Sequence, residues 1–113
     1  MGRGLIEFAG ASLLFMTAAA LAAPPTLSIV NATGADIIVM EVRRVGGKSW
    51  KSVSLTAPAG KAASAAFADP DCAFDLKVAL SNGESVTFSG VNLCDAKLLT
   101  LRRTGTTAWV DYD

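Results

Sequence analysis

The side chains that most often perform catalysis are scarce in this sequence. It contains no histidine, which removes the commonest general base and a common metal ligand. Ser49 and Lys51 are close together, and a serine activated by a lysine can act as a nucleophile. Residues two apart on a strand merely share a face, however, and this does not make a reacting pair. We therefore expect a protein that is not an enzyme, with no catalytic residues and no cofactor.

Three aspartates, Asp69, Asp71 and Asp95, lie beside the chain's only two cysteines, Cys72 and Cys94. If the cysteines are joined, the three carboxylates gather at one end of the segment between them, and Ca²⁺ prefers such clusters of oxygen ligands. No Asp-x-Asp-x-Asp-Gly loop is present, and the residues from Asp69 to Asp71 are more simply explained as a turn that opens a strand. The aspartates are therefore weak candidates for a calcium site, and we predict no metal centre.

Three large aromatic residues with a polar group are candidates for ligand binding. Exposed Trp and Tyr rings stack on sugars and anchor protein partners. Trp109 alternates with Asp111, which indicates a wet face, so we expect Trp109 and Tyr112 to form a binding surface. Trp50 is a further candidate, although packing in the core is the simpler expectation for it.

The segment between the cysteines has the pattern of a β-hairpin. From Cys72 onward, alternate residues are apolar: Phe74, Leu76, Val78 and Leu80. Asn82-Gly83 follows, and such a pair supplies the positive φ angles of a hairpin turn. Beyond the turn, Val86 and Phe88 alternate with polar residues.

Two registers of this hairpin keep its apolar faces together. A loop of residues 82–84 sets Val78 against Phe88 and places the two cysteines opposite each other. A loop of residues 81–83 also matches the faces, but the cysteines then need a bulge to meet, and Gly90 is a natural place for it. Either register brings the sulfurs together. We therefore predict a disulfide between Cys72 and Cys94, which leaves no thiol nucleophile.

The first 22 residues have the anatomy of a secretory signal peptide. Arg3 precedes an uncharged, mostly apolar run from Phe8 to Leu21, and Ala20-Leu21-Ala22 is a small-x-small cleavage site. The run is shorter than the roughly 20 residues that span a bilayer, although an uncleaved anchor is the alternative. We predict cleavage after Ala22 or Ala23, one domain at residues 23–113, and a periplasmic or secreted location, where disulfides form.

Short strand-like segments separated by turn signals fill the rest of the chain. Besides the hairpin, we expect strands near residues 26–31, 36–45, 48–55, 61–68, 97–103 and 106–112. Gly46-Gly47 predicts a tight hairpin, and the start of the strand at 36–45 is apolar on both faces, as in an inner strand. The pattern predicts the all-β class: a small antiparallel, immunoglobulin-like sandwich of about seven strands with one disulfide. An open barrel is the alternative.

The charge balance favours no anionic partner. Ten basic and ten acidic residues give a net charge of zero, so we expect binding neither to nucleic acid nor to an anionic membrane surface. Lys48, Lys51, Arg102 and Arg103 are typical of the charges that protect sheet edges. The segment Asn31-Ala32-Thr33 matches a glycosylation sequon, but a turn closed by the Asn31 side chain is the simpler explanation.

Several short motifs resemble a family of small exported proteobacterial proteins of uncharacterised function. The motifs are Asn31-x-Thr33-Gly34, Trp50, Pro58-x-Gly60, Cys72-x-x-Asp75-Leu76-x-Val78, Asn82-Gly83 and Val91-Asn92-Leu93-Cys94. The resemblance covers residues 27–94; it implies export and the disulfide, and it supplies no mechanism. Some similar short reading frames carry the label argininosuccinate lyase, but that enzyme is a large helical tetramer whose motifs do not occur here.

These observations predict a non-catalytic exported binding or interaction module of the bacterial envelope. Its partner would be a protein or a glycan, and it would meet the membrane only through the signal peptide during export. The alternative is a structural envelope protein without a dedicated ligand. Weaker alternatives are a calcium-stabilised module and a small enzyme.

Overall fold

The computed structural model describes residues 26–94 and 98–113, in which eight strands and no helix are found. The strands are β1 (Thr26–Ala32), β2 (Ile37–Arg44), β3 (Lys51–Val53), β4 (Ala62–Ala66), β5 (Ala73–Leu80), β6 (Ser85–Asn92), β7 (Leu99–Thr104) and β8 (Thr107–Tyr112). No described segment is a helix long and apolar enough to cross a membrane. The predicted signal peptide with its cleavage site, and Asp95, lie outside the described residues.

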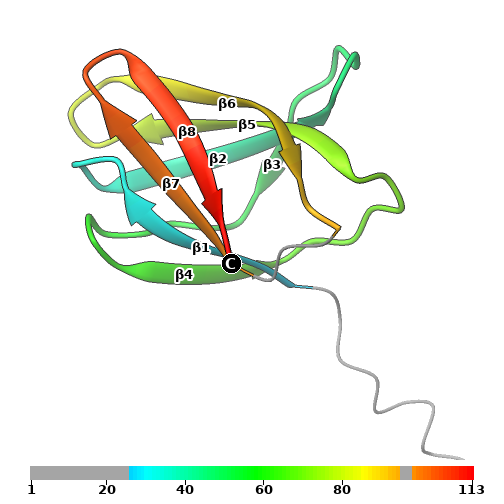
Figure 1. Cartoon of the computed structure of the whole chain (residues 1–113), viewed down its shortest axis with the longest axis horizontal. Coiled ribbons are helices and arrows are strands. Elements are labelled where there is room, and N and C mark those ends of the chain that lie inside the picture. The colour runs from blue at the N-terminus through cyan, green and yellow to red at the C-terminus, as the bar shows by residue number, and fades with distance from the viewer. Residues whose placement is uncertain (1–25, 95–97) are drawn as a thin grey trace, which may run out of the picture.

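The strands form two four-stranded sheets that pack face to face (Figure 1), with strand orders β4-β1-β7-β8 and β3-β2-β5-β6. The predicted all-β sandwich with one disulfide is confirmed. Neighbouring strands are antiparallel in every pair except one, because β1 runs parallel to β7. Local alternation predicts a strand but not its distant neighbour, so this pairing had no signal in the sequence.

The core lies between the two sheets and is built from alternate residues of each strand. In β5 the alternation is complete, and all four predicted inward residues are at most 1% exposed: Phe74, Leu76, Val78 and Leu80. They meet Ile29, Leu99 and Leu101 of the other sheet, which are equally buried. Because one face of each sheet is apolar and the other is polar, a shift of register by one residue would turn a whole strand inside out.

The hairpin adopts the second of the two predicted registers. Val78 pairs with Val86 and Leu76 with Phe88, so the loop consists of residues 81–83. Between Leu76 and Phe74 the register shifts by one residue, because Ser89 and Gly90 together face Asp75. Gly90 has a φ of +65°, a backbone conformation that other residues rarely adopt, so glycine suits this position of the bulge. The predicted bulge at Gly90 is thus confirmed.

The predicted disulfide between Cys72 and Cys94 is present, with the two Cα atoms 5.0 Å apart. The extra residue of the bulge shifts the pairing of the strand end by one position. The backbone N–H of Leu93, rather than that of Cys94, therefore donates to the carbonyl of Cys72 at 2.9 Å, and Cys94 follows within reach of Cys72. The bond therefore fastens β5 to β6 one step beyond the end of their ladder. It closes the hairpin at the end opposite to its turn.

Removing the disulfide should lower the free energy of unfolding. We expect the double variant Cys72→Ser/Cys94→Ser to lose about 3 kcal/mol, since the bond restricts a loop of this length in the unfolded chain. Urea unfolding of the variant and of the wild-type protein measures this loss. Wild-type protein under a reductant is the matched control and should lose a similar amount; a double variant as stable as the oxidised protein would contradict the prediction.

The predicted turn at Gly46-Gly47 is present, but the hairpin around it is not tight, because the strand expected at 48–55 shrinks to β3. The chain turns after Arg44, whose carbonyl accepts the N–H of Gly47 at 2.8 Å, and residues 47–50 then form a loop. At the end of this loop the ring of Trp50 lies against two cations, Arg43 and Lys77. The strand expected at 61–68 is confirmed as β4.

The start of β2 is not buried on both faces as expected. A register shift between Ile37 and Val39 leaves Ile38 as an extra residue, so that Ile38 and Val39 are 51% and 45% exposed. Ile37 instead points into the core and exchanges backbone hydrogen bonds with Ala57, at 2.8 and 3.0 Å. The bulge therefore sends two consecutive apolar side chains outward.

Asn31 is a structural residue. Its side chain is fully buried, accepts the backbone N–H of Thr33 at 3.0 Å and the Thr33 hydroxyl at 2.6 Å, and donates to the carbonyls of Ala35 and Ala57 at 2.8 and 2.9 Å. The predicted turn closed by Asn31 is confirmed. A buried amide with these partners joins the end of β1 to two loops of the sandwich.

Candidate functional site

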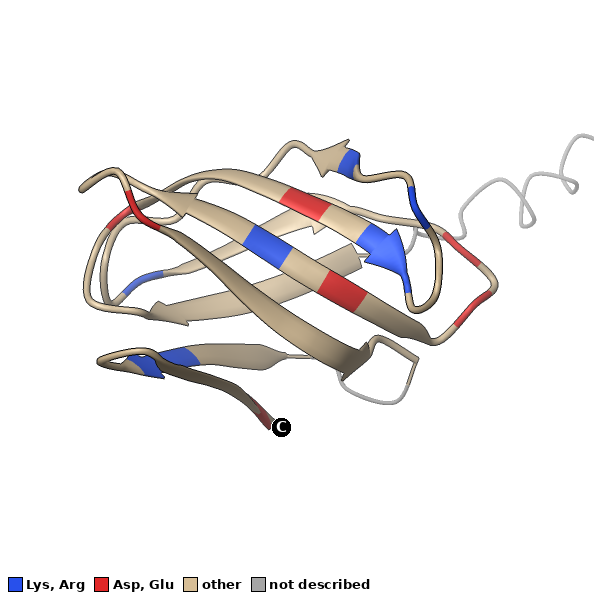
Figure 2. Ribbon diagram, turned by 90° about the horizontal axis from the view of Figure 1, so that it is seen from above, with Lys and Arg blue, Asp and Glu red and all other residues tan. Residues whose placement is uncertain are grey.

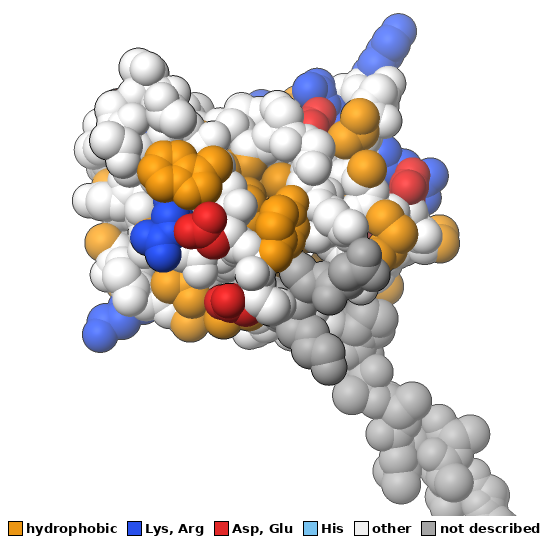
Figure 3. All heavy atoms as spheres, viewed as in Figure 1, with side chains coloured by type: hydrophobic (Ala, Val, Ile, Leu, Met, Phe, Trp, Pro, Cys, Tyr) orange, Lys and Arg blue, Asp and Glu red, His pale blue; other side chains and the backbone are white. Residues whose placement is uncertain are grey.

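Trp109 lies on the outer face of β8, at the edge of its sheet. It is 39% exposed, and its partner in the register is Arg102 of β7. On the same face, the Arg102 guanidinium pairs with the Asp111 carboxylate of β8. The indole therefore stands beside an ion pair at the surface. Figure 3 shows hydrophobic side chains on the visible face as separate groups among polar atoms, without one continuous apolar patch.

We expected Tyr112 and Trp109 to form one binding surface, but Tyr112 lies on the other side of β8 and does not share the outer face with Trp109. Side chains alternate along a strand, and residues three apart point to opposite faces. Tyr112 pairs with Leu99, which faces the core, and its hydroxyl accepts the backbone N–H of Asn92 in β6 at 3.1 Å. Although it is 49% exposed, Tyr112 thus ties the two sheets together along their open side.

Trp50 is half-buried on the surface and does not pack in the core as expected. The guanidinium carbon of Arg43 and the Lys77 ammonium nitrogen each lie 4.4 Å from the centroid of its ring. These distances are those of cation–π contacts, which favour an indole over other rings. Trp50 therefore covers the two cations and offers only part of its ring to a ligand.

The outer face of β2 and β5 carries alternating charges (Figure 2). Arg43 Nε lies 3.0 Å from Asp75 Oδ2, and Lys77 Nζ lies 3.7 Å from Glu41 Oε1. In each pair the two residues stand directly opposite each other in the register. Opposite charges at such positions stabilise a sheet, so these charges hold Trp50 and each other and leave no excess of either sign.

Asp75 is the most constrained carboxylate of this face. Its Oδ1 accepts the backbone N–H of Gly90 at 3.0 Å, and its Oδ2 accepts Arg43 Nε at 3.0 Å. The Gly90 hydrogen bond, followed by the hydrogen bond and charge of Arg43, holds the pKa of Asp75 below its ordinary value, although burial opposes this shift. The ionised form is therefore the one that the fold favours.

The lowered pKa of Asp75 predicts how stability changes with pH. Because the folded-state value lies below the unfolded value of about 3.9, ionised Asp75 stabilises the protein above that pH, and the contribution is lost as the pH falls through the folded-state pKa. We expect the free energy of unfolding to fall less steeply between about pH 5 and pH 2 in Asp75→Asn than in the wild type. Urea unfolding at a series of pH values measures both slopes.

Arg43→Gln is the matched control for this prediction. It removes the cation but keeps the carboxylate and the Gly90 N–H, which is the larger cause of the shift. We therefore expect Arg43→Gln to retain most of the wild-type pH dependence. Equal slopes in the wild type and in Asp75→Asn would show that Asp75 does not titrate as described.

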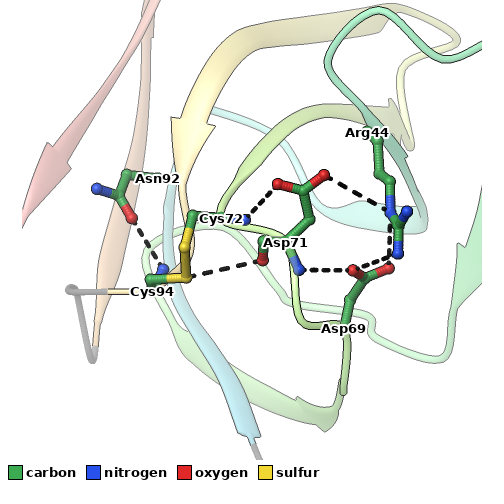
Figure 4. Close-up of a disulfide and its surroundings, with 6 residues drawn as sticks. All are labelled: Arg44, Asp69, Asp71, Cys72, Asn92 and Cys94. Atoms are coloured by element: carbon green, nitrogen blue, oxygen red, sulfur yellow. Dashed lines mark hydrogen bonds and ion pairs between the residues drawn. A yellow bond between two sulfur atoms is a disulfide. The ribbon is translucent and has the colours of Figure 1, made fainter.

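The two described aspartates of the predicted acidic cluster bind an arginine (Figure 4). Arg44 Nη2 lies 2.9 Å from Asp69 Oδ1, and Arg44 Nε lies 3.8 Å from Asp71 Oδ2. Asp69 Oδ1 also accepts the backbone N–H of Asp71 at 2.9 Å, which closes the expected turn before β5. This hydrogen bond, followed by that of Arg44, lowers the pKa of Asp69.

Arg44 thus supplies the positive charge at this end of the hairpin. Among residues 26–94 and 98–113, no group of three or more His, Cys, Asp or Glu side chains lies close enough to hold a metal ion. The third candidate, Asp95, is outside those residues. Ser49 and Lys51 are both exposed, and no hydrogen bond joins them among the described contacts.

A cleft of about 520 Å³ opens beside the disulfide, and Leu27, Phe67 and Leu93 are among its lining residues. The Phe67 ring stands edge-on to Phe74, with centroids 5.3 Å apart. Two lining residues, Thr26 and Cys94, adjoin segments outside the described residues, so we assign no ligand to this cleft. Of the three aromatic candidates, Trp109 is the one that lies on the outer face of β8 without a described hydrogen bond or cation contact.

Comparison with known proteins adds to the fold and not to the site. No protein-family model matches the chain, and no curated protein matches it. The fold is similar to the NMR structure of a protein from Eubacterium rectale, with a TM-score of 0.53 and 14% sequence identity over 77% of this chain and 85% of that one. At this identity the likeness shows a shared fold alone.

Proposed function

We propose that this chain is a non-catalytic exported module that binds a glycan through the outer face of β7 and β8. The observation that carries the proposal is the indole of Trp109, which is 39% exposed on that face. An indole at a surface offers a sugar ring a flat apolar area for stacking. The guanidinium of Arg102 and the carboxylate of Asp111 lie beside it and can donate to and accept from sugar hydroxyls.

The neighbours of Trp109 support this choice. The strand register places two exposed threonines on the same outer face, Thr104 and Thr107, whose side chains are short and carry hydroxyl groups. Short neighbours leave the indole accessible. A site for a small ligand combines an apolar surface with a few polar groups that set orientation, and this face has both.

Export is part of the same proposal. The signal-peptide anatomy of residues 1–22 supports it, and the disulfide is compatible with it, since such bonds persist in oxidising compartments. The mature protein would then be periplasmic or secreted. An envelope location brings a sugar-binding module close to abundant glycans.

Truncation of Trp109 tests the binding site. A glycan array identifies ligands of the mature protein, and isothermal titration calorimetry with such a ligand gives the affinity of the wild type and of each variant. We expect Trp109→Ala to weaken binding roughly 30-fold, or about 2 kcal/mol, as for a central aromatic anchor. Trp50→Phe is the control and should bind as the wild type does.

Two outcomes would contradict this proposal. If Trp109→Ala kept every interaction of the wild type, the outer face of β8 would not be the site. If a peptide library bound and the glycan array did not, the ligand class would be wrong. Binding to neither would leave the structural envelope role without a dedicated ligand.

The mass of the exported protein tests the location. After expression of the full chain in a bacterial host, we expect the mass of a mature chain that begins near Ala23. This mass should be about 2 Da below that of the reduced form, because a disulfide lacks two hydrogens. Native mass spectrometry before and after reduction measures both. A full-length mass with two free thiols would overturn the export proposal.

A further inference from the structure

The outer edge of β4 is an unprotected sheet edge. β4 pairs with β1 on one side, and no described strand pairs with its other side, where Figure 1 shows it as the last strand of its sheet. Its five residues, Ala62–Ala66, carry no charge, no proline and no bulge. Exposed edges with these properties pair readily with another strand, and proteins usually block them.

The other three edges each have a protecting feature. β3 is three residues long and begins at Lys51. β6 carries the bulge at Gly90, and β8 lies alongside it, with the Tyr112 hydroxyl bonded to β6. β8 itself presents the charge of Asp111. Within the described part of the chain, β4 is therefore the edge that stands out.

The ladder with β1 fixes which backbone groups of β4 point outward. The N–H of Asn31 donates to the carbonyl of Lys61 at 2.9 Å, and bonded pairs alternate with non-bonded pairs along an antiparallel ladder. Ala63 and Ala65 therefore bond to β1, and the N–H and C=O groups of Ala62, Ser64 and Ala66 point away from it. These three residues are exposed, so they offer a row of donors and acceptors.

The sequence of β4 is its own mirror image. A second copy placed antiparallel about a two-fold axis at Ser64 sets Ser64 against Ser64 and Ala62 against Ala66. Because Ala-Ala-Ser-Ala-Ala reads the same in both directions, the opposed residues are then of the same type. The residues brought opposite each other are the three whose backbone groups point outward. Every one of these groups finds a partner, which gives about six interchain hydrogen bonds.

We propose that β4 is a homodimer interface, in which two copies of this chain join their β4 strands about a two-fold axis at Ser64. The β4-β1-β7-β8 sheets of the two copies then become one continuous eight-stranded sheet. The same surface serves both subunits, as closed symmetry requires. This inference goes beyond glycan binding and does not depend on it.

The side chains around the axis fit this arrangement. On the outer face, the Ser64 hydroxyl lies 2.8 Å from that of Ser28 in β1, so the dimer aligns four serines in a row across the axis. Cross-strand serine pairs stabilise such ladders. The side chains of Ala63 and Ala65 are small and half-buried toward the core, so nothing bulky blocks the approach. The net charge of zero opposes association little.

Strand pairing alone buries less surface than the standard interface of roughly 1,600 Å², so we expect a weak dimer, half-formed at roughly 0.1 mM protein. Sedimentation velocity of the mature, oxidised protein over a wide concentration range should show this equilibrium. Ser64→Lys places two like charges at the axis and should weaken the dimer at least tenfold. Ser52→Lys, at an exposed serine in β3 of the other sheet, adds the same charge away from the interface; it is the matched control and should dimerise nearly as the wild type does.

Cross-linking tests the register without relying on the lysine variants. Opposed residues of bonded pairs have Cα atoms about 5.5 Å apart, which suits a disulfide. Under copper phenanthroline, Ser64→Cys should form covalent dimers, and an equimolar mixture of Ala62→Cys and Ala66→Cys should do so more than either alone. Circular dichroism confirms that each variant is folded.

The proposal would be overturned by a wild type that stays monomeric up to about ten times the expected midpoint, by a dimer that Ser64→Lys leaves unchanged, or by cross-linking without this register preference. A heterologous strand bound at β4 in a monomeric protein would likewise replace the self-pairing. Trp109→Ala should leave the dimer intact, so failure of the glycan site and failure of the dimer are distinguishable.

Discussion

The hydrogen bond from the backbone of Gly90 to the Asp75 carboxylate is the contact on which the hairpin depends. It stabilises the bulge in which Ser89 and Gly90 share one partner, and this extra residue allows both Phe88 and Val91 to face the core. Without it the period of two would send one of them outward. The same offset carries Cys94 to Cys72, so the disulfide and the buried end of β6 both follow from one local geometry.

The two outer faces of the sandwich differ in how their polar groups are used. On the sheet containing β2 and β5, each charge faces its opposite and the cations lie against Trp50, so the polar groups satisfy one another. On the sheet containing β7 and β8, one ion pair borders an indole that is 39% exposed. The polar groups of the first face are therefore paired with one another, and the proposed glycan site lies on the second.

Local signals predicted those parts of the fold that are local. Alternation from Phe74 to Leu80, the Asn82-Gly83 turn and the glycine at position 90 predicted a hairpin whose two possible registers both bring the cysteines together. The parallel neighbour of β1, the bulge at Ile38 and the position of Trp50 depend on distant side chains and had no such signal. For the site, the exposed face of Trp109 followed from its alternation with Asp111, whereas the reach of Tyr112 to β6 required the packed sandwich.

The parallel pairing of β1 with β7 also constrains the order in which the molecule can be built. β1 can pair early with β4, but Ile29 also meets Leu99, so the other edge of β1 waits for a neighbour that follows it by about 70 residues. A chain that emerges with its N-terminus first can assemble the sheet of β2, β3, β5 and β6 early, while the apolar face of that sheet is still partly uncovered. The sandwich closes only when the last two strands arrive. During this interval the growing chain is most exposed to aggregation.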